Sequence, residues 1–288
     1  MIIDCHIHLW DAPRNEALTP AGYGRFTRTT GGSVQMVPVS FVDCRSPAEL
    51  ALAHMDWLGI DRAVVVQEWL DGRQDDYLAA VAREHADRLW ICGLLDGRDP
   101  DGAPRYVEHM AEELGFHGLK VTAAHFQDTR LDDARFMRTW QRCAELGVRV
   151  VAHLAPGRRM VDPVATIATT FPDLIFVVAH LGLPPHADWH EQAALAIRPN
   201  VFLDASGLTA LFAAEGYPFP GAQQAVKEAL DIVGPGKIMW GSDYPRCIVD
   251  VSYKEILDLF RRECDFLTDQ ERAGILGQTA ARVYAPGD

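Results

Sequence analysis

The sequence has few features of a membrane or nucleic-acid-binding protein. No apolar run approaches the roughly 20 residues of a membrane-spanning helix, and the N-terminus lacks the basic lead of a signal peptide. Lys and Arg number 27 against 40 Asp and Glu, which gives a net charge of −13. Phosphate backbones and anionic membranes attract positive surfaces, so this charge argues against both as partners. A small anionic substrate is still compatible, because one or two local arginines could hold it.

Paired cysteines and several common catalytic motifs are also missing. The six cysteines occur without a CxxC pair, which predicts reduced, mostly buried thiols in a cytoplasmic protein. The chain has no GxSxG nucleophile elbow, no HExxH, no P-loop and no complete GxGxxG. None of these motifs therefore offers an alternative to the histidines described below as the catalytic site.

What the sequence does contain is a regular alternation of short apolar runs and helical segments. The runs are rich in β-branched residues and mostly do not alternate with polar ones, as expected of strands buried on both faces. Eight such strands are expected, at residues 1–8, 62–67, 89–94, 117–121, 148–153, 174–180, 200–204 and 237–243.

Helical segments follow these strands without a composition break that would mark a linker. The first is expected from Ser46, a residue type that caps helices, to about Leu58, before Gly59. Eight units of this kind predict one (β/α)8 TIM-barrel domain over residues 1–288, with an additional C-terminal helix at about 268–284. An open doubly wound sheet is the alternative. Residues 11–45 are expected to form a long irregular connection.

Polar residues at the expected strand ends indicate an active site. His6 and His8 point to the same side, because side chains alternate along a strand. His153, His180 and Asp243 end other strands, and the C-terminal ends of barrel strands form the catalytic face. We therefore expect a metal or catalytic site there. His54, His85 and His109 fall in expected helices and are predicted to be surface residues.

Several of these elements resemble one enzyme family. His6-x-His8, Ala179-His180-Leu181-Gly182, Gly241-Ser242-Asp243-Tyr244-Pro245 and the closing segment 275–284 are similar to the amidohydrolase superfamily, and more narrowly to its amidohydrolase-related (amidohydrolase 2) branch. The resemblance covers the whole chain. That branch includes aminocarboxymuconate-semialdehyde decarboxylase and its relatives, sugar-lactone hydrolases such as fuconolactonase, and pyrone-dicarboxylate lactonase.

The resemblance implies a metal site and two catalytic residues. One divalent metal ion, zinc or alternatively manganese, would be surrounded by His6, His8, His153 and Asp243. Asp243 would take a proton from the attacking water and return it to the leaving group. His180 would orient that water or stabilise the developing oxyanion.

Other residues are expected to contact the substrate. Arg246 follows the Gly241–Pro245 element and could hold an anionic group. In two-metal members of the superfamily a lysine on the fourth strand is carbamylated, and Lys120 has a matching position. A substrate-binding or structural role is expected for Lys120, with a carbamate as the alternative. The loop 11–45 and Tyr217 could form a lid. The expected substrate contacts are Lys120, Arg246, Glu68, Trp10 and Tyr244.

These features predict a cytoplasmic hydrolase that attacks the carbonyl of a small polar substrate, with a lactone or related cyclic ester favoured. The Gln67 end of strand two and residues 189–208 are similar to sugar lactonases, whereas Asp204 and Gly118-Leu119-Lys120 depart from them. The alternatives are a metal-dependent non-oxidative decarboxylase, a metal-free lactonase or lactone isomerase, and a barrel that only binds a ligand. The additional C-terminal helix could join a homo-oligomer contact. The sequence specifies neither the substrate nor the oligomeric state.

Overall fold

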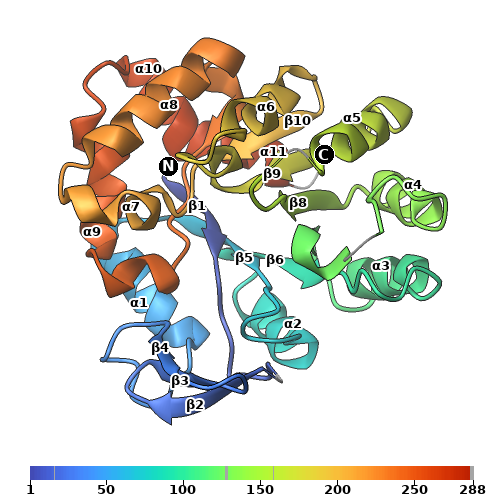
Figure 1. Cartoon of the computed structure of the whole chain (residues 1–288), viewed down its shortest axis with the longest axis horizontal. Coiled ribbons are helices and arrows are strands. Elements are labelled where there is room, and N and C mark those ends of the chain that lie inside the picture. Colours follow the sequence, from blue (N-terminus) through green and yellow to red (C-terminus); the bar gives the residue numbers. More distant parts are fainter. Residues whose placement is uncertain (16, 127–128, 158, 286–288) are drawn as a thin grey trace.

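Eight parallel strands form a nearly closed barrel with helices around it (Figure 1). The computed structural model describes residues 1–15, 17–126, 129–157 and 159–285. The strands follow one another around the barrel as β1 (Ile3–Ile7), β5 (Arg62–Val66), β6 (Leu89–Leu94), β7 (Gly118–Thr122), β8 (Arg149–His153), β9 (Phe176–Val178), β10 (Val201–Asp204) and β11 (Ile238–Met239). The structure confirms the predicted (β/α)8 barrel, since short apolar strands joined by helices pair in parallel.

The helices surround the strands (Figure 1), and most of them bury apolar residues in the core. They are α1 (Ala48–Leu58), α2 (Asp75–Glu84), α3 (Ala103–Glu112), α4 (Met137–Glu145), α5 (Val161–Thr170), α6 (Trp189–Ala193), α7 (Leu208–Leu211), α8 (Pro220–Val233), α9 (Tyr253–Asp258), α10 (Asp269–Ala273) and α11 (Thr279–Tyr284). The additional C-terminal helix is confirmed: a π-helical turn joins α10 to α11, and a capping box between Thr268 and Glu271 opens α10. No helix among the described residues is both long and apolar enough to cross a membrane.

The barrel closes between β1 and β11 through individual hydrogen bonds. Cys5 N donates to Trp240 O at 3.0 Å, and Asp243 N donates to His6 O at 2.9 Å. The buried carboxylate of Asp4 adds a further connection, accepting from Ser242 N at 2.9 Å. This closure brings Asp243 next to the histidines of β1.

A small antiparallel sheet follows β1 and corrects one prediction. Residues 11–45 were expected to be irregular, yet they contain β2 (Leu18–Gly22), β3 (Arg25–Arg28) and β4 (Ser33–Gln35). These strands are short and mostly exposed, so the sequence shows neither a buried run nor a clear alternation. The sheet projects from the barrel below β1 in Figure 1, and we call it the lid sheet.

The six cysteines are all free and buried, as predicted. Cys5 and Cys92 pack inside the barrel with strand residues, whereas Cys143 and Cys247 belong to the core between strands and helices.

Candidate active site

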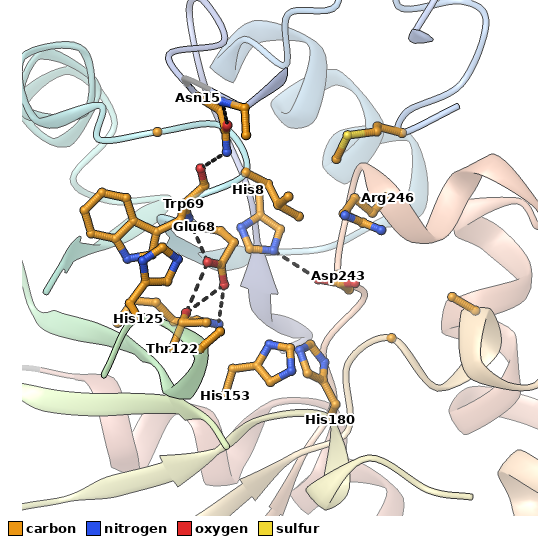
Figure 2. A pocket seen from close by; sticks show the side chains of 18 of the residues that line it. His8, Asn15, Glu68, Trp69, Thr122, His125, His153, His180, Asp243 and Arg246 are labelled. Atoms are coloured by element: carbon orange, nitrogen blue, oxygen red, sulfur yellow. Dashed lines mark hydrogen bonds and ion pairs between the residues drawn. The ribbon is translucent and has the colours of Figure 1, made fainter. Parts of the chain in front are cut away.

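A deep cavity of about 1020 Å³ lies at the C-terminal ends of the barrel strands. The lining includes residues at or just after the ends of several strands, among them His8 after β1, His153 at the end of β8 and Asp243 after β11 (Figure 2). Among the residues that the sequence singled out, those in the lining are His8, Glu68, Lys120, His153, His180, Asp243 and Arg246.

His6 lies behind this cavity and is held by a carboxylate. Its Nδ1 is 2.7 Å from Asp204 Oδ2, and both side chains are fully buried. Burial lowers the pKa of His6 to about 4. Burial alone would raise the pKa of Asp204, but its interactions with His6, including their hydrogen bond, hold that pKa well below its usual range. The neutral imidazole therefore carries its hydrogen on Nδ1 and donates it to Asp204. His6 Nε2 has no hydrogen-bond partner among the described residues, so its lone pair is available.

His8 is held in the same tautomer by a main-chain oxygen. Its Nδ1 donates to Val66 O at 2.6 Å, and its Nε2 lies 3.0 Å from Asp243 Oδ1 (Figure 2). Burial alone would lower the pKa of His8, but Asp243 raises it above the ordinary value. Burial alone would raise the pKa of Asp243, but its hydrogen bond with His8 and its electrostatic interactions with the surrounding histidines hold that pKa well below its usual range. Asp243 is therefore ionised at neutral pH.

His180 is fixed by Ser206 on the loop after β10. Its Nδ1 lies 2.9 Å from Ser206 Oγ and 3.1 Å from Ser206 O. Because Ser206 Oγ donates to the Asp204 carboxylate, it accepts from His180 Nδ1. The remaining nitrogen, Nε2, is then the acceptor. Gly207 has φ +70°, and a Cβ there would lie 3.2 Å from His180 Nδ1, so this position requires glycine.

The three imidazoles and Asp243 converge on one space. Ligand atoms of His6, His8 and Asp243 all lie within 4.8 Å of one another, and the His6 and His180 ring centroids are 5.1 Å apart. Lone pairs of neutral imidazoles together with a carboxylate are ligands that zinc prefers, and hydrogen bonds from Nδ1 orient such ligands. The donor set therefore fits a divalent metal.

His153, the fourth expected ligand, lies beside His180 and not within this close group. The two ring centroids are 5.0 Å apart with the planes at 80°. Burial, followed by the charges of His180 and Lys120, lowers the pKa of His153 to about 3. A neutral His153 therefore faces the cavity.

Glu68 and Lys120 both line the cavity, and Figure 2 shows Glu68 beside Thr122. Lys120 Nζ lies 3.7 Å from Glu68 Oε2, and only 1% of its side chain is exposed. Glu68 also accepts hydrogen bonds from Thr122 Oγ1 at 3.0 Å and from Trp69 N at 2.7 Å. Burial alone would raise the pKa of Glu68, but Lys120 lowers it. This ion pair fits an ammonium on Lys120 and not a carbamate, which would place two negative charges together.

At the mouth of the cavity, Arg246 places a positive charge that has no partner in the described part of the chain. It is exposed, lines the cavity, and has no hydrogen bond or ion pair to any other described residue. Three other lining arginines are already engaged: Arg14 with Asp11, Arg73 with Leu94 O, and Arg98 with Asp96.

Two expected substrate contacts lie elsewhere. Tyr244 is fully buried and does not line the cavity, since its ring packs 5.3 Å from the ring of Tyr253 and 5.5 Å from that of His54. The same contact shows that His54, expected at the surface, is half-buried. Trp10 is also buried, donates from its indole N–H to Cys44 O at 2.7 Å, and reaches only a narrow pocket beside the cavity.

Tyr217, expected in a lid, is an exposed residue outside the cavity lining that donates to Glu263. The lid sheet itself reaches the cavity through Gln35 and the adjacent Met36. The expectation that the 11–45 segment covers part of the mouth is thus supported by these contacts.

Sequence reasoning missed several residues of the site. Asp204 was noted only as a departure from the lactonase pattern, although it ends β10 as the histidines end their strands. Ser206 follows it. Trp69 and His125, which stack with ring centroids 4.5 Å apart at the cavity, each follow a strand closely. Position after a strand was the signal that could have found them.

Comparisons with known proteins agree with this architecture. A model of the amidohydrolase family matches residues 3–285. L-fucono-1,5-lactonase of Burkholderia multivorans is 30% identical over 259 residues, which cover 81% of this chain and 83% of the lactonase. The structure of an amidohydrolase from Burkholderia multivorans with bound Zn has a TM-score of 0.76 at 25% identity and covers 100% of both chains. The 5-carboxyvanillate decarboxylase of Sphingomonas paucimobilis shares the fold, with a TM-score of 0.65 at 18% identity over 84% of each chain. Because the family model spans nearly the whole sequence, the chain belongs to the amidohydrolase family of enzymes.

Proposed function

We propose that this protein is a metal-dependent hydrolase that opens a lactone or related cyclic ester. The observation that carries the proposal is the convergence of His6, His8 and Asp243 beside His180, with Nδ1 of all three histidines fixed by protein oxygens. The Nδ1 atom of each histidine lies 2.6–2.9 Å from a protein oxygen that can accept its hydrogen, and ligand atoms of His6, His8 and Asp243 lie within 4.8 Å of one another. Such a cluster of acceptors is stabilised by a cation.

His6, His8 and Asp243 would hold the metal, with His153 and His180 close by. Zinc suits this donor set, and the related Burkholderia multivorans amidohydrolase binds Zn. A bound zinc ion would supply a Lewis acid that polarises the substrate carbonyl and acidifies water.

The chain's own residues would handle the proton and the substrate. The ionised Asp243 accepts a proton from the attacking water and delivers it to the ring oxygen as the ester bond breaks. His180 presents Nε2 to the cavity as a hydrogen-bond acceptor and so orients the water. Arg246 binds an anionic or strongly polar group of the substrate, while Glu68 and Lys120 keep one wall rigid.

Two observations favour ester opening over decarboxylation. The curated relative that is 30% identical is an L-fucono-1,5-lactonase. The decarboxylase described above resembles this chain at 18% identity, which supports the shared barrel alone.

A metal-free lactonase is the second candidate. The His8–Asp243 contact is also satisfied if His8 carries a second proton, and Asp243 raises the pKa of His8 in that direction. The positive charge of an imidazolium at His8 would then stabilise the negative charge that develops on the carbonyl oxygen, in place of the metal.

The two reactions can be separated with substrate panels. Zinc-loaded and chelator-treated protein is offered lactones, followed with a pH indicator, and aromatic carboxylates, followed by CO2 release. We expect acid release from a lactone that depends on zinc and disappears in Asp243→Asn. Asp250→Asn, which removes another carboxylate of the cavity lining, serves as the control and should remain active. CO2 release without lactone opening would contradict the proposal, and equal lactonase activity after metal removal would favour the metal-free candidate.

A further inference from the structure

Apolar residues line one side of the main cavity. They come from the loops after β9, β10 and β11, three strands that are neighbours in the barrel. Leu183 follows β9, Ala210 and Leu211 lie on α7 after β10, and Val249 ends the turn that begins at Arg246 after β11. We call Leu183, Ala210, Leu211 and Val249 the apolar face.

The loops that carry the apolar face also carry the candidate catalytic groups. A Cβ on Gly207 would lie 3.2 Å from His180 Nδ1 and 3.4 Å from Asp243 Oδ2, so the main chain that leads into α7 passes close to both side chains. Leu183 N donates to His180 O at 2.8 Å, and Cys247 N donates to Asp243 O at 3.2 Å. The apolar face therefore borders the proposed reaction centre.

The core does not account for two residues of the apolar face. Neither Leu183 nor Val249 packs into a hydrophobic core cluster of the described chain. Leu183 also has φ +68°, a left-handed conformation that is uncommon for a leucine, and such conformations cluster at active sites and ligand-binding loops. Apolar surface in contact with water is unfavourable. A ligand that covers this face would therefore gain binding free energy.

The side of the cavity across the barrel has a different character. The lining residues at or after the ends of β5, β6 and β7 include Glu68, Arg73, Arg98, Lys120, Thr122 and His125. Arg246 lies toward His8, since both line the narrow pocket beside the cavity, to which the apolar face contributes no residue. Polar and apolar groups of a substrate would therefore bind on different sides of the cavity.

The cavity is also larger than a bare lactone ring requires. Its volume of about 1020 Å³ lies at the upper end of the range for pockets that bind drug-sized ligands, ~300–1,000 Å³. A five- or six-membered ring at the histidines would leave most of this volume unfilled. The cavity therefore has room for a substituent of several carbons.

We propose that the substrate carries an apolar substituent of several carbons, which covers the apolar face. In the proposed reaction Asp243 delivers a proton to the ring oxygen, so the carbon attached to that oxygen lies nearest this face. The substituent is therefore an alkyl or aryl group on the carbon that bears the ring oxygen. This inference rests on the proposed function as far as the lactone ring and its orientation are concerned. The apolar face determines specificity and takes no part in the reaction.

A series of γ-lactones tests the substituent. The parameter kcat/KM is measured for γ-butyrolactone and for its γ-ethyl, γ-pentyl and γ-hydroxymethyl derivatives, each as separate enantiomers. In one enantiomeric series we expect a rise of about two- to fourfold per methylene and of about tenfold or more for the pentyl compound, because each buried methylene adds binding free energy. The hydroxymethyl derivative should gain no such advantage. Equal values for the unsubstituted and pentyl lactones would overturn the proposal.

Variants of the apolar face connect the preference to these residues. Leu183→Asn introduces a polar side chain that tolerates a positive φ, and Val249→Thr replaces one methyl group with a hydroxyl. The ratio of kcat/KM for the pentyl lactone to that for the unsubstituted one should fall about tenfold in Leu183→Asn and about threefold in Val249→Thr.

The matched control is Leu70→Asn, at a leucine that lines the cavity after β5. This variant should keep the wild-type ratio, and thermal unfolding shows that each variant is folded. A wild-type ratio in both Leu183→Asn and Val249→Thr, or an equal loss in Leu70→Asn, would contradict the assignment to the apolar face.

A binding measurement separates this inference from the proposed reaction. Cyclopentanone and 3-pentylcyclopentanone imitate the two lactones, but they have no ring oxygen and cannot be hydrolysed. Calorimetry should show about tenfold tighter binding of the pentyl compound to the wild type, and a smaller difference in Leu183→Asn but not in Leu70→Asn. If this holds while no lactone is opened, the proposed reaction is wrong and the apolar site stands. If lactones are opened and the two ketones bind equally, the proposed reaction stands and the apolar site is overturned.

Discussion

His8 Nε2 lies 3.0 Å from Asp243 Oδ1, and His8 Nδ1 donates to Val66 O at 2.6 Å. A neutral His8 in this position would direct a lone pair at a carboxylate oxygen, an arrangement of two acceptors with no hydrogen between them. Either a second proton on His8 or a cation bound by both His8 and Asp243 would remove the repulsion between these two acceptors. The candidate site is therefore built around a positive charge, and proton and metal are expected to compete for it.

This competition predicts that zinc binding releases a proton near pH 6. Asp243 raises the pKa of His8, so His8 is largely protonated there without metal, whereas His6, with its pKa lowered to about 4, is already neutral. Zinc must displace the His8 proton, and its affinity should fall as the pH decreases. Calorimetric titration in two buffers of different ionisation enthalpy measures the release. Zinc binding without proton release at pH ~6 would contradict the assigned protonation of His8.

Asp204 and Ser206 should have separable effects on the metal and on catalysis. Asp204→Asn removes the acceptor that orients His6, and zinc affinity should fall by about 10- to 100-fold, as is typical when such a partner is lost. Ser206→Ala removes a partner of His180 and should lower kcat with little change in zinc affinity. Competition with a fluorescent zinc chelator and steady-state kinetics measure the two effects. Equal zinc affinity in wild type and Asp204→Asn would show that the tautomer of His6 does not depend on Asp204.

Asp4 predicts an unusual dependence of stability on pH. Burial raises its pKa from 3.8 to about 6, so the folded state binds this proton more tightly than the unfolded state between those values. The contribution of Asp4 to the free energy of unfolding is therefore largest below pH ~4 and decreases by about 3 kcal/mol as the pH rises through ~6.

Asp4→Asn imitates the protonated side chain and isolates this effect, because both proteins share every other titrating group. Urea unfolding from pH ~4 to ~7 gives the free energy of each protein. The wild type should lose stability relative to the variant as the pH rises. A difference that is constant, or that grows in favour of the wild type, would contradict the raised pKa.

Arg246→Ala should weaken the binding of anionic substrates more than that of neutral ones. The side chain has no partner among the described residues, so its removal disrupts no internal contact. We expect KM for a carboxylate-bearing lactone to rise about tenfold, and Arg246→Lys to restore part of the loss. Arg45→Ala, which removes an exposed arginine paired with Asp43 outside the cavity lining, is the control. Equal changes in KM for charged and neutral lactones would contradict the role assigned to Arg246.

The barrel and most of the cavity could be predicted because their residues follow simple rules. Buried parallel strands appear as apolar runs, and an isolated polar residue at the end of such a run, such as His153, can only lie at the catalytic face. The same rule gave a wrong prediction for Tyr244. Because Tyr244 directly follows Asp243, it was expected to line the cavity, but its ring packs inward against Tyr253.

The lid sheet and the Asp204 contact could not be predicted. Exposed strands such as β3 bury a single residue, Phe26, and therefore leave no alternating pattern. The pairing of Asp204 with His6 depends on the barrel bringing together residues 198 positions apart. The order of the strands predicts that His6 and Asp204 both lie near the cavity. It does not predict which carboxylate accepts a hydrogen bond from which imidazole.

Zinc stoichiometry shows whether His6, His8 and Asp243 hold a metal ion. Metal-free protein is incubated with zinc, separated from free ion by gel filtration and measured by plasma mass spectrometry, beside Asp243→Ala and the cavity control Asp250→Ala. We expect about one zinc ion per chain in the wild type and in Asp250→Ala, and almost none in Asp243→Ala. A wild-type protein that retains no zinc, or an Asp243→Ala variant that retains as much as the wild type, would contradict this metal site.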